Sequence, residues 1–238
     1  VEEMGAEPMR WLFSDQNLST NLNFGYGPAS EVKRRFLTLW NTYGFFVLYA
    51  NIHGTNPMVL EAEENQTVLD RWLLSRLQLL IRDVGNALEN HNLQHGVRAV
   101  EGFFDDLSNW YVRLNRRRFW DNEDAAYCTL HHTLVSLSQL LAPFLPFLAE
   151  EIYQNLICSV DKHAPESVHL CDFPKVQEDL IDDQLMADMA LASQVVSLGR
   201  SARTNAGIKV RQPLSEVKVW GQMEEESLER LKELILKE

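Results

Sequence analysis

Cysteines, glycine-rich motifs and long apolar runs are scarce in this sequence of 238 residues, and each scarcity excludes a class of protein. The three cysteines, Cys128, Cys158 and Cys171, are far apart and form no C-x-x-C pair. This pattern argues against a disulfide framework or a thiolate zinc site, and it favours a reducing, cytoplasmic location. No apolar run approaches the roughly 20 residues of a membrane-spanning helix, and residues 1–4 do not resemble a signal peptide, so no membrane partner is expected.

Catalytic signatures are scarce as well. The sequence contains neither of the phosphate-binding patterns G-x-x-x-x-G-K-[ST] and G-x-G-x-x-G, and it has no G-x-S-x-G nucleophile elbow. His91 and His95 have a helical metal-ligand spacing, but the neighbouring asparagines favour a surface turn. The adjacent His131 and His132 point in different directions, and residues 150–151 are typical of a solvated helical face rather than of a catalytic carboxylate pair. We therefore expect no catalytic residue, metal site or cofactor within this chain.

The charge of the chain is unevenly distributed. Acidic residues outnumber basic ones by 34 to 22, which gives a formal net charge of −12. Residues 1–120 carry 12 Lys and Arg against 14 Asp and Glu, whereas residues 121–238 carry 10 against 20. Residues 110–120 contain four arginines and no acid. Binding to phosphates requires Lys and Arg. The acidity of the chain therefore does not exclude a nucleic-acid partner, but it limits the binding surface to the basic part of the chain.

Helical periodicity dominates residues 28–160. Apolar residues recur at spacings of three and four, and prolines at 143 and 146 interrupt the pattern. We predict a mainly α fold, an antiparallel helical bundle, whose first helix is capped by Ser30. The expected helices span residues 28–51, 69–88, 94–120, 124–141 and 147–156.

The tail, residues 161–238, differs in its pattern. Period-two alternation predicts a strand at 167–171 and a hairpin formed by 208–211 and 216–220. Helical patterns span 179–204 and 224–237. We therefore expect a small C-terminal α/β subdomain. Both ends of the chain fall within a pattern, which we interpret as a fragment of a longer protein.

Residues 110–120, WYVRLNRRRFW, are the strongest candidate for a binding surface. On a helical wheel of 100° per residue, one arc is apolar and a second arc, about 120° away, holds Arg and Trp. The apolar arc contains Val100, Phe103, Leu107, Tyr111 and Leu114. The second arc contains Asn109, Arg113, Arg116, Arg117 and Trp120, with Trp110 at its border. Arg forks suit phosphates and indole rings stack on bases, while the alternative is a solvated helix end whose arginines complement the helix dipole.

Several motifs resemble one family in the same order along the chain. Residues 106–113 (DLSNWYVR) with 116–120 (RRRFW), residues 70–77 (DRWLLSRL) and residues 141–153 (LAPFLPFLAEEIY) are similar to the anticodon-binding domain of isoleucyl-tRNA synthetases. Residues 5–11 resemble the segment after the family's KMSKS loop, and residues 203–214 resemble its junction after the bundle.

The resemblance implies a domain division and a function. Residues 1–27 would link to a catalytic domain and contact the tRNA stem, residues 28–160 would form the anticodon-binding bundle, and residues 161–238 would form the junction subdomain. The family's enzymes ligate isoleucine to its tRNA with ATP and Mg²⁺. The HIGH and KMSKS signatures of that activity are absent from this sequence, so the chain alone is expected to be catalytically inactive.

The resemblance also implies binding roles and a partner. The expected partner is an isoleucine-specific tRNA bound by its anticodon stem-loop, and the protein is expected to be a monomer. Arg113, Arg116 and Arg117 would meet phosphates, with Lys209 and Arg211 as further phosphate contacts. Trp110 or Trp120 would stack on a loop base, and Asn109 or Asn41 would hydrogen-bond a base edge. Many relatives have Arg immediately before and three positions after Asn41, where this chain has Trp40 and Gly44, so no Arg contact from that helix carries over.

Two other functions remain open at this point. One is a helical scaffold or protein-interaction module without RNA binding, which would bind its partner with little dependence on salt. The other is a self-sufficient enzyme, which would catalyse ATP–pyrophosphate exchange. Steeply salt-dependent RNA binding would favour the anticodon-binding module.

Overall fold

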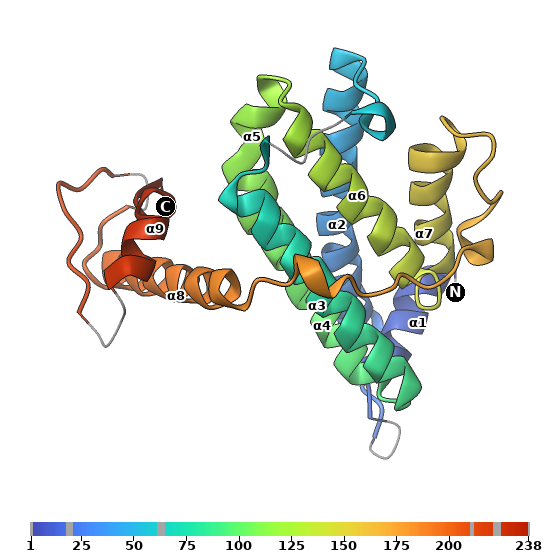
Figure 1. The fold of residues 1–238 in the computed structure, drawn as a ribbon. Coiled ribbons are helices and arrows are strands. Elements are labelled where there is room, and N and C mark those ends of the chain that lie inside the picture. The colour runs from blue at the N-terminus through green and yellow to red at the C-terminus, as the bar shows by residue number, and fades with distance from the viewer. Residues whose placement is uncertain (1, 18–20, 61–64, 210–211, 221–224, 238) are drawn as a thin grey trace. The chain divides into compact units, whose positions relative to one another are not determined.

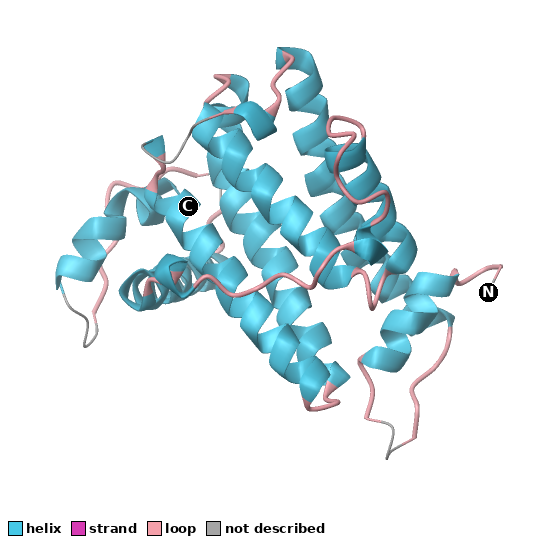
Figure 2. Ribbon diagram, turned by 45° about the vertical axis from the view of Figure 1, so that its right-hand side comes forward, coloured by secondary structure: helices cyan, strands magenta, loops and turns pink. Residues whose placement is uncertain are grey.

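The computed structural model describes residues 2–17, 21–60, 65–209, 212–220 and 225–237. The chain divides into two compact units, Val1–Ile181 and Asp182–Glu238. Within the described residues every regular element is helical, as Figures 1 and 2 show. None of the helices in these ranges is long and apolar enough to cross a membrane.

The first unit is an antiparallel helical bundle, as the periodicity predicts. Its α-helices are α1 (Ala6–Ser14), α2 (Tyr26–His53), α3 (Val68–Glu89), α4 (Leu93–Asp105), α5 (Arg113–Trp120), α6 (Asp124–Leu141) and α7 (Pro146–Tyr153). Two π-helical segments, η3 (Asp106–Val112) and η4 (Gln154–Cys158), continue α4 and α7, and the 3-10 turns are η1 (Pro57–Val59), η5 (Val168–Leu170) and η6 (Glu178–Leu180).

Local sequence signals explain where these helices begin and end. The hydroxyl of Thr67 accepts from the backbone N–H of Asp70, whose carboxylate accepts from Thr67 N–H in return, so a capping box starts α3. The helix α2 ends at Gly54, whose φ of 64° is left-handed. The prediction that Ser30 caps α2 is wrong, because the helix already begins at Tyr26 and the Ser30 hydroxyl donates to the Tyr26 carbonyl.

The core of the first unit is built around α3, which packs against both α4 and α6. α3 and α4 form a tight antiparallel pair, and α6 packs against α3 (Figure 1). The core side chains contributed by these three helices are almost entirely apolar. Those with no more than 1% exposure include Leu73, Leu77, Leu80, Val84, Val97, Val100, Phe103, Leu130, Leu134 and Leu137. Burial of these side chains supplies the main driving force for the bundle.

The second unit consists of α8 (Asp183–Asn205) and α9 (Glu225–Lys237), which pack on each other. The nearly buried carboxylate of Asp188 pairs with the Arg230 guanidinium at 2.8 Å, and Leu231 of α9 is buried. The two helices occupy the positions predicted from their periodicity.

The strands predicted in the tail are wrong wherever the structure describes them. Residues 167–171 instead form the 3-10 turn η5, in which the Ser167 hydroxyl accepts from His169 N–H. Residues 208–209 and 216–220 belong to no strand, while Val210 and Arg211 lie outside the described residues. Alternating apolar residues failed as a signal because a strand also needs a neighbouring strand to bond with. Val217, Val219 and Trp220 are 53%, 39% and 84% exposed, so no packed sheet covers them. In the described part of the expected α/β subdomain, every regular element is therefore a helix, and the remaining residues form turns and loops.

Candidate nucleic-acid interface

The predicted binding surface lies on η3 and α5, which follow α4 without a break. We call its five outward residues, Asn109, Arg113, Arg116, Arg117 and Trp120, the arginine stripe. All five are exposed, and Trp120 exposes 56% of its surface. The opposite face is buried through Leu107, Tyr111 and Phe119. The helical wheel therefore predicted the orientation of this face correctly.

The stripe begins in a π-helical segment that the wheel did not anticipate. In η3, the backbone N–H of Arg113 donates to the carbonyl of Ser108, five residues earlier. Asp106, at the start of this segment, pairs with Arg76 of α3 at 2.9 Å. Burial raises the pKa of the Asp106 carboxyl, against the opposing effect of Arg76. Such π segments occur often at functional sites, because they redirect the side chains that follow.

The stripe side chains differ in how they are held. Arg113 Nε donates to the carbonyl of Asn109 at 2.7 Å, and Arg117 Nε donates to Asp121 at 3.3 Å. The Arg117–Asp121 pair is 87% and 56% exposed, so it contributes little to stability. Arg116 and Trp120 make no hydrogen bond or ion pair with the described residues. The guanidinium of Arg116 and the indole of Trp120 remain available to a ligand.

The other predicted contacts lie in different places. Asn41 is exposed on α2 beside Trp40, which is 39% exposed and tilted against Tyr43 at 5.0 Å. One helical turn later, the Phe45 ring meets the Phe119 ring edge-on at 5.2 Å, which joins this part of α2 to α5. Trp110 in η3 is half-buried.

The predicted phosphate contacts of the tail belong to the second unit, whereas the arginine stripe belongs to the first. Lys209 is exposed in the second unit. Arg211 lies outside the described residues. The structure thus gathers the stripe residues on one helical stretch and brings α2 beside it.

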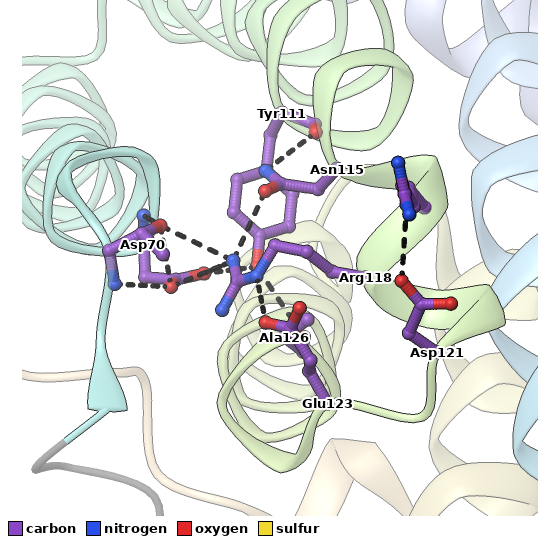
Figure 3. A network of polar contacts seen from close by, with 9 residues as sticks. Asp70, Tyr111, Asn115, Arg118, Asp121, Glu123 and Ala126 are labelled. Atoms are coloured by element: carbon purple, nitrogen blue, oxygen red, sulfur yellow. Dashed lines mark hydrogen bonds and ion pairs between the residues drawn. The ribbon is translucent and has the colours of Figure 1, made fainter.

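Arg118 has a different role from the other arginines of the run. Its guanidinium turns inward and bonds both Asp70 at 2.9 Å and Glu123 at 2.7 Å. Figure 3 shows it lying between these two carboxylates, while Asp121 lies apart from them. Only 13% of the Arg118 side chain is exposed, and Asp70 is fully buried. One arginine therefore ties α5 to α3 and to the start of α6, which fixes the stripe on the bundle.

Further hydrogen bonds complete this buried network. The Tyr111 hydroxyl donates to Asp70 at 2.6 Å, and the side-chain oxygen Oδ1 of Asn115 accepts from Arg118 at 3.1 Å. Burial, with the Asp70 charge beside it, holds the pKa of Tyr111 well above its usual value. Burial alone would lower the pKa of Arg118, but hydrogen bonds to Asp70 and Glu123 raise it. Both groups therefore keep their protons throughout the physiological range.

Sequence reasoning missed the Asp70–Arg118 pair. The two residues are 48 positions apart, and no helical or strand spacing connects them. The unusual placement of Asp70 among buried leucines was the available signal, because an acid is almost never fully buried without a partner.

Other basic side chains near the start of the bundle are engaged in the fold. Arg10 donates to the carbonyls of Pro143 and Phe144, and Arg35 pairs with Glu101. The part of the chain that the structure describes contains no group of three or more His, Cys, Asp or Glu arranged for a metal ion.

Glu150 is not the solvated residue that its sequence context predicted. Its carboxylate accepts from Gln154 Nε2, from the Ser167 hydroxyl and from Val168 N–H. Burial alone would raise the pKa of Glu150, but these hydrogen bonds lower it. The residue anchors the turn η5 on α7.

His131 gives the bundle a testable dependence on pH. Burial lowers the pKa of its imidazole, partly opposed by a hydrogen bond with the Leu156 carbonyl. The unfolded chain, with a pKa near 6.5, therefore binds the proton first as the pH falls. The contribution to stability is present above about pH 6.5 and is lost below it. We expect His131→Gln to reduce the fall in unfolding free energy between pH 7 and pH 5, measured by urea denaturation.

The matched control is His163→Gln, at an exposed position of the same unit. This variant should follow the pH profile of the unmodified chain. A His131→Gln profile that also follows it would contradict the assignment.

Comparisons with known proteins agree with this geometry. The family model of the anticodon-binding domain of tRNA ligase matches residues 70–219. The chain is 45% identical over 226 residues to an isoleucine–tRNA ligase of Clostridium acetobutylicum, covering 92% of this chain and 22% of that protein. It is 47% identical over 247 residues to one of Dehalococcoides mccartyi, covering 100% of this chain and 24% of the relative. The chain thus spans about a quarter of the length of these relatives.

A solved structure shows the same fold. In the ternary complex of Agrobacterium radiobacter K84 LeuRS with tRNA and LeuAMS, one region aligns with a TM-score of 0.52 and 20% identity. The alignment covers 76% of this chain and 21% of that one. The helical architecture is therefore shared beyond the range of close sequence similarity.

Proposed function

This chain belongs to the family of anticodon-binding domains of tRNA ligases, and from that premise we propose that it recognises the anticodon stem-loop of an isoleucine tRNA. The observation that carries the proposal is the arginine stripe, an outward row of guanidinium groups and an indole on a chain of net charge −12. Exposed arginines gathered on one helical face are the footprint that phosphate binding requires.

The arginines position the RNA. Arg116 offers a free guanidinium fork, and Arg117 is held only by an exposed pair with Asp121 that a phosphate can displace. Arg113 lies on the same exposed face. Contacts of this kind fix the register of the RNA backbone but carry no sequence information.

The aromatic and amide groups read the loop. Trp120, more than half exposed at the end of α5, offers an indole face on which an unstacked base can lie. Asn109 and Asn41 present amides that can hydrogen-bond a base edge. Lys209, Arg211 and the half-buried Trp110 are further proposed contacts.

The test replaces Arg116 and Arg117 together by Ala and measures binding of an isoleucine anticodon stem-loop RNA. The double variant removes two phosphate-binding groups, so we expect roughly tenfold weaker binding at low salt. The slope of log K against log[salt] should become shallower by about 0.7 for each phosphate that is no longer bound. Fluorescence anisotropy at several salt concentrations measures both quantities.

A charge-matched control is the double substitution Arg82→Ala and Arg98→Ala, which also removes two partly exposed arginines from the bundle. It should leave both the affinity and the slope almost unchanged. Equal effects from the two double variants, or none from either, would refute the proposal and favour a protein-interaction scaffold without RNA binding.

The parent protein's activity is part of the same proposal. The relatives are ligases of isoleucine and tRNA, and this sequence has neither HIGH nor KMSKS, which supports our proposal that the ATP- and Mg²⁺-dependent step belongs to another part of the parent protein. We also propose that the protein is a monomer and that it is located in the cytoplasm; the three free thiols support the location. If this chain alone catalysed ATP–pyrophosphate exchange, the proposal that the catalytic step belongs to another part of the parent protein would be wrong.

A further inference from the structure

Two of the three cysteines lie at the two ends of the loop that follows α7 and η4. Cys158 is the last residue of η4, and Cys171 comes directly after the turn η5. The chain between them forms turns and η5, and it runs beside α7 in Figure 1. A single loop therefore connects the two thiols, and no α-helix separates them.

Side chains of α7 and η4 hold this loop close to the helix. The Glu150 carboxylate accepts from the Ser167 hydroxyl at 2.8 Å and from Val168 N–H at 3.0 Å. One turn further along the helix, Gln154 Nε2 donates to the carbonyl of Glu166. These contacts fix the middle of the loop, so the positions of both cysteines relative to the helix are defined.

Both thiols face the same stretch of backbone. Cys158 Sγ donates to the carbonyl of Pro165 at 3.4 Å, and Cys171 Sγ lies 3.7 Å from the carbonyl of Ser167. The buried Tyr153 donates its hydroxyl to the same Pro165 carbonyl at 3.2 Å, and its side chain also hydrogen-bonds Cys171. One tyrosine and one carbonyl thus connect the surroundings of the two sulfur atoms.

The titration of Cys158 gives independent support for this proximity. Burial raises the pKa of the Cys158 thiol, and the charges of Glu150 and Cys171 raise it further, against the opposing charge of Lys162. Because the thiolate is the reactive form, Cys158 reacts slowly at pH 7 and faster as the pH rises. Both cysteines are partly exposed, so a small reagent can reach them.

The loop is able to bring the two sulfur atoms together. A disulfide requires Cα atoms about 4.4–6.8 Å apart. Between the cysteines, η5 is the only regular element of the described chain, and most of the side chains there are exposed, with Val168 as a buried anchor. Closing the bond therefore moves a surface loop and leaves the packed helices in place.

We propose that Cys158 and Cys171 are a modification site, at which hydrogen peroxide converts the two thiols into a reversible intramolecular disulfide. One thiolate attacks the O–O bond of the peroxide, which yields a sulfenic acid and, after protonation, one water. The sulfur of the second cysteine then attacks the sulfenic sulfur, the S–S bond forms and a second water leaves. The two thiols lose two electrons and two protons in total, and one peroxide is reduced to two waters.

This inference goes beyond the proposed function and does not depend on RNA binding. In a reducing compartment the pair rests as two free thiols, which is the state of the structure. Cys128 is the third thiol and lies against the carbonyl of Pro57, at 3.7 Å. It therefore serves as an internal reference for oxidation without a partner.

The experiment treats the reduced 238-residue chain with hydrogen peroxide and counts thiols in denaturant. Two of the three thiols should be lost, the mass should fall by two hydrogen atoms, and dithiothreitol should reverse both changes. Protease digestion followed by mass spectrometry should yield one linked peptide pair, containing Cys158 and Cys171. The rate should rise about tenfold from pH 7 to pH 8, because the thiolate fraction rises by that factor well below the pKa. The oxidised chain should unfold at a urea concentration about 1 M higher.

The matched variants are Cys171→Ser and Cys128→Ser, which each remove one partly exposed thiol. Cys128→Ser should form the disulfide at the rate of the unmodified chain, whereas Cys171→Ser should form none and should oxidise further, past the point that dithiothreitol reverses. Equal urea midpoints of the reduced proteins would show that both variants are folded. Linked peptides that contain Cys128, a disulfide that joins two chains, or a Cys158–Cys171 link that forms only in urea would each overturn the proposal.

Discussion

Replacing Asp70 by Asn is expected to lower the free energy of unfolding of the bundle by about 3 kcal/mol. The carboxylate is fully buried and accepts from Arg118, Tyr111 and Thr67. An amide of the same size removes the negative charge opposite a guanidinium that is only 13% exposed, and it turns an NH₂ group toward other donors. Glu123, which also pairs with Arg118, limits the loss of stability. Urea denaturation followed by circular dichroism measures the change.

Two controls separate burial from the mere removal of a carboxylate. Asp121→Asn breaks the exposed pair with Arg117 and should cost less than about 1 kcal/mol. Tyr111→Phe removes one hydrogen bond to Asp70 and should cost about 1–2 kcal/mol. If Asp70→Asn costs no more than Asp121→Asn, the network does not hold α5 to the bundle.

Replacing Phe119 by Ala is expected to cost about 3–5 kcal/mol. Its ring is completely buried and meets the rings of Phe45 and Tyr127 edge-on, each at 5.2 Å. Truncation leaves a cavity between α2, α5 and α6, because neighbours fixed on three helices cannot all move into the space. The substitution lies directly before Trp120, so the end of the stripe should lose order as well. Thermal unfolding and stem-loop affinity measured below the transition test the two effects.

A matched control is Phe147→Ala, at a position 67% exposed. It removes the same atoms from water-exposed surface and should cost less than about 1 kcal/mol. The more conservative Phe119→Leu should fall between the two Ala variants. A Phe119→Ala variant as stable as Phe147→Ala would show that the aromatic cluster contributes little.

Periodicity predicted the helices of the bundle because each helix buries one face in a shared core. The pattern of Leu73, Leu77, Leu80 and Val84 placed α3 within one residue of its observed limits. The same logic failed in the tail. Val217 and Val219 alternate with polar residues as in a strand, yet they are exposed and lie in no sheet. Alternation is compatible with a strand, but only a neighbouring strand can supply the hydrogen bonds that make one.

For the candidate site, the sequence predicted which arginines point outward, but it did not predict which arginine has a structural role. The wheel placed Arg113, Arg116 and Arg117 outward, and all three are exposed. It could not show that Arg118, adjacent in the same run, turns inward to Asp70 and Glu123. Nor could it show the π-helical segment η3, which depends on how the helix packs.

The sequence by itself determined the helical class, the family and the basic face of one helix, because these follow from short-range patterns along the chain. Only the tertiary structure decided which arginine is structural, and that Phe45 of α2 packs on Phe119 of α5. The physical reason is that such contacts join side chains far apart in sequence. Their partners are set by how the helices pack, which no local spacing encodes.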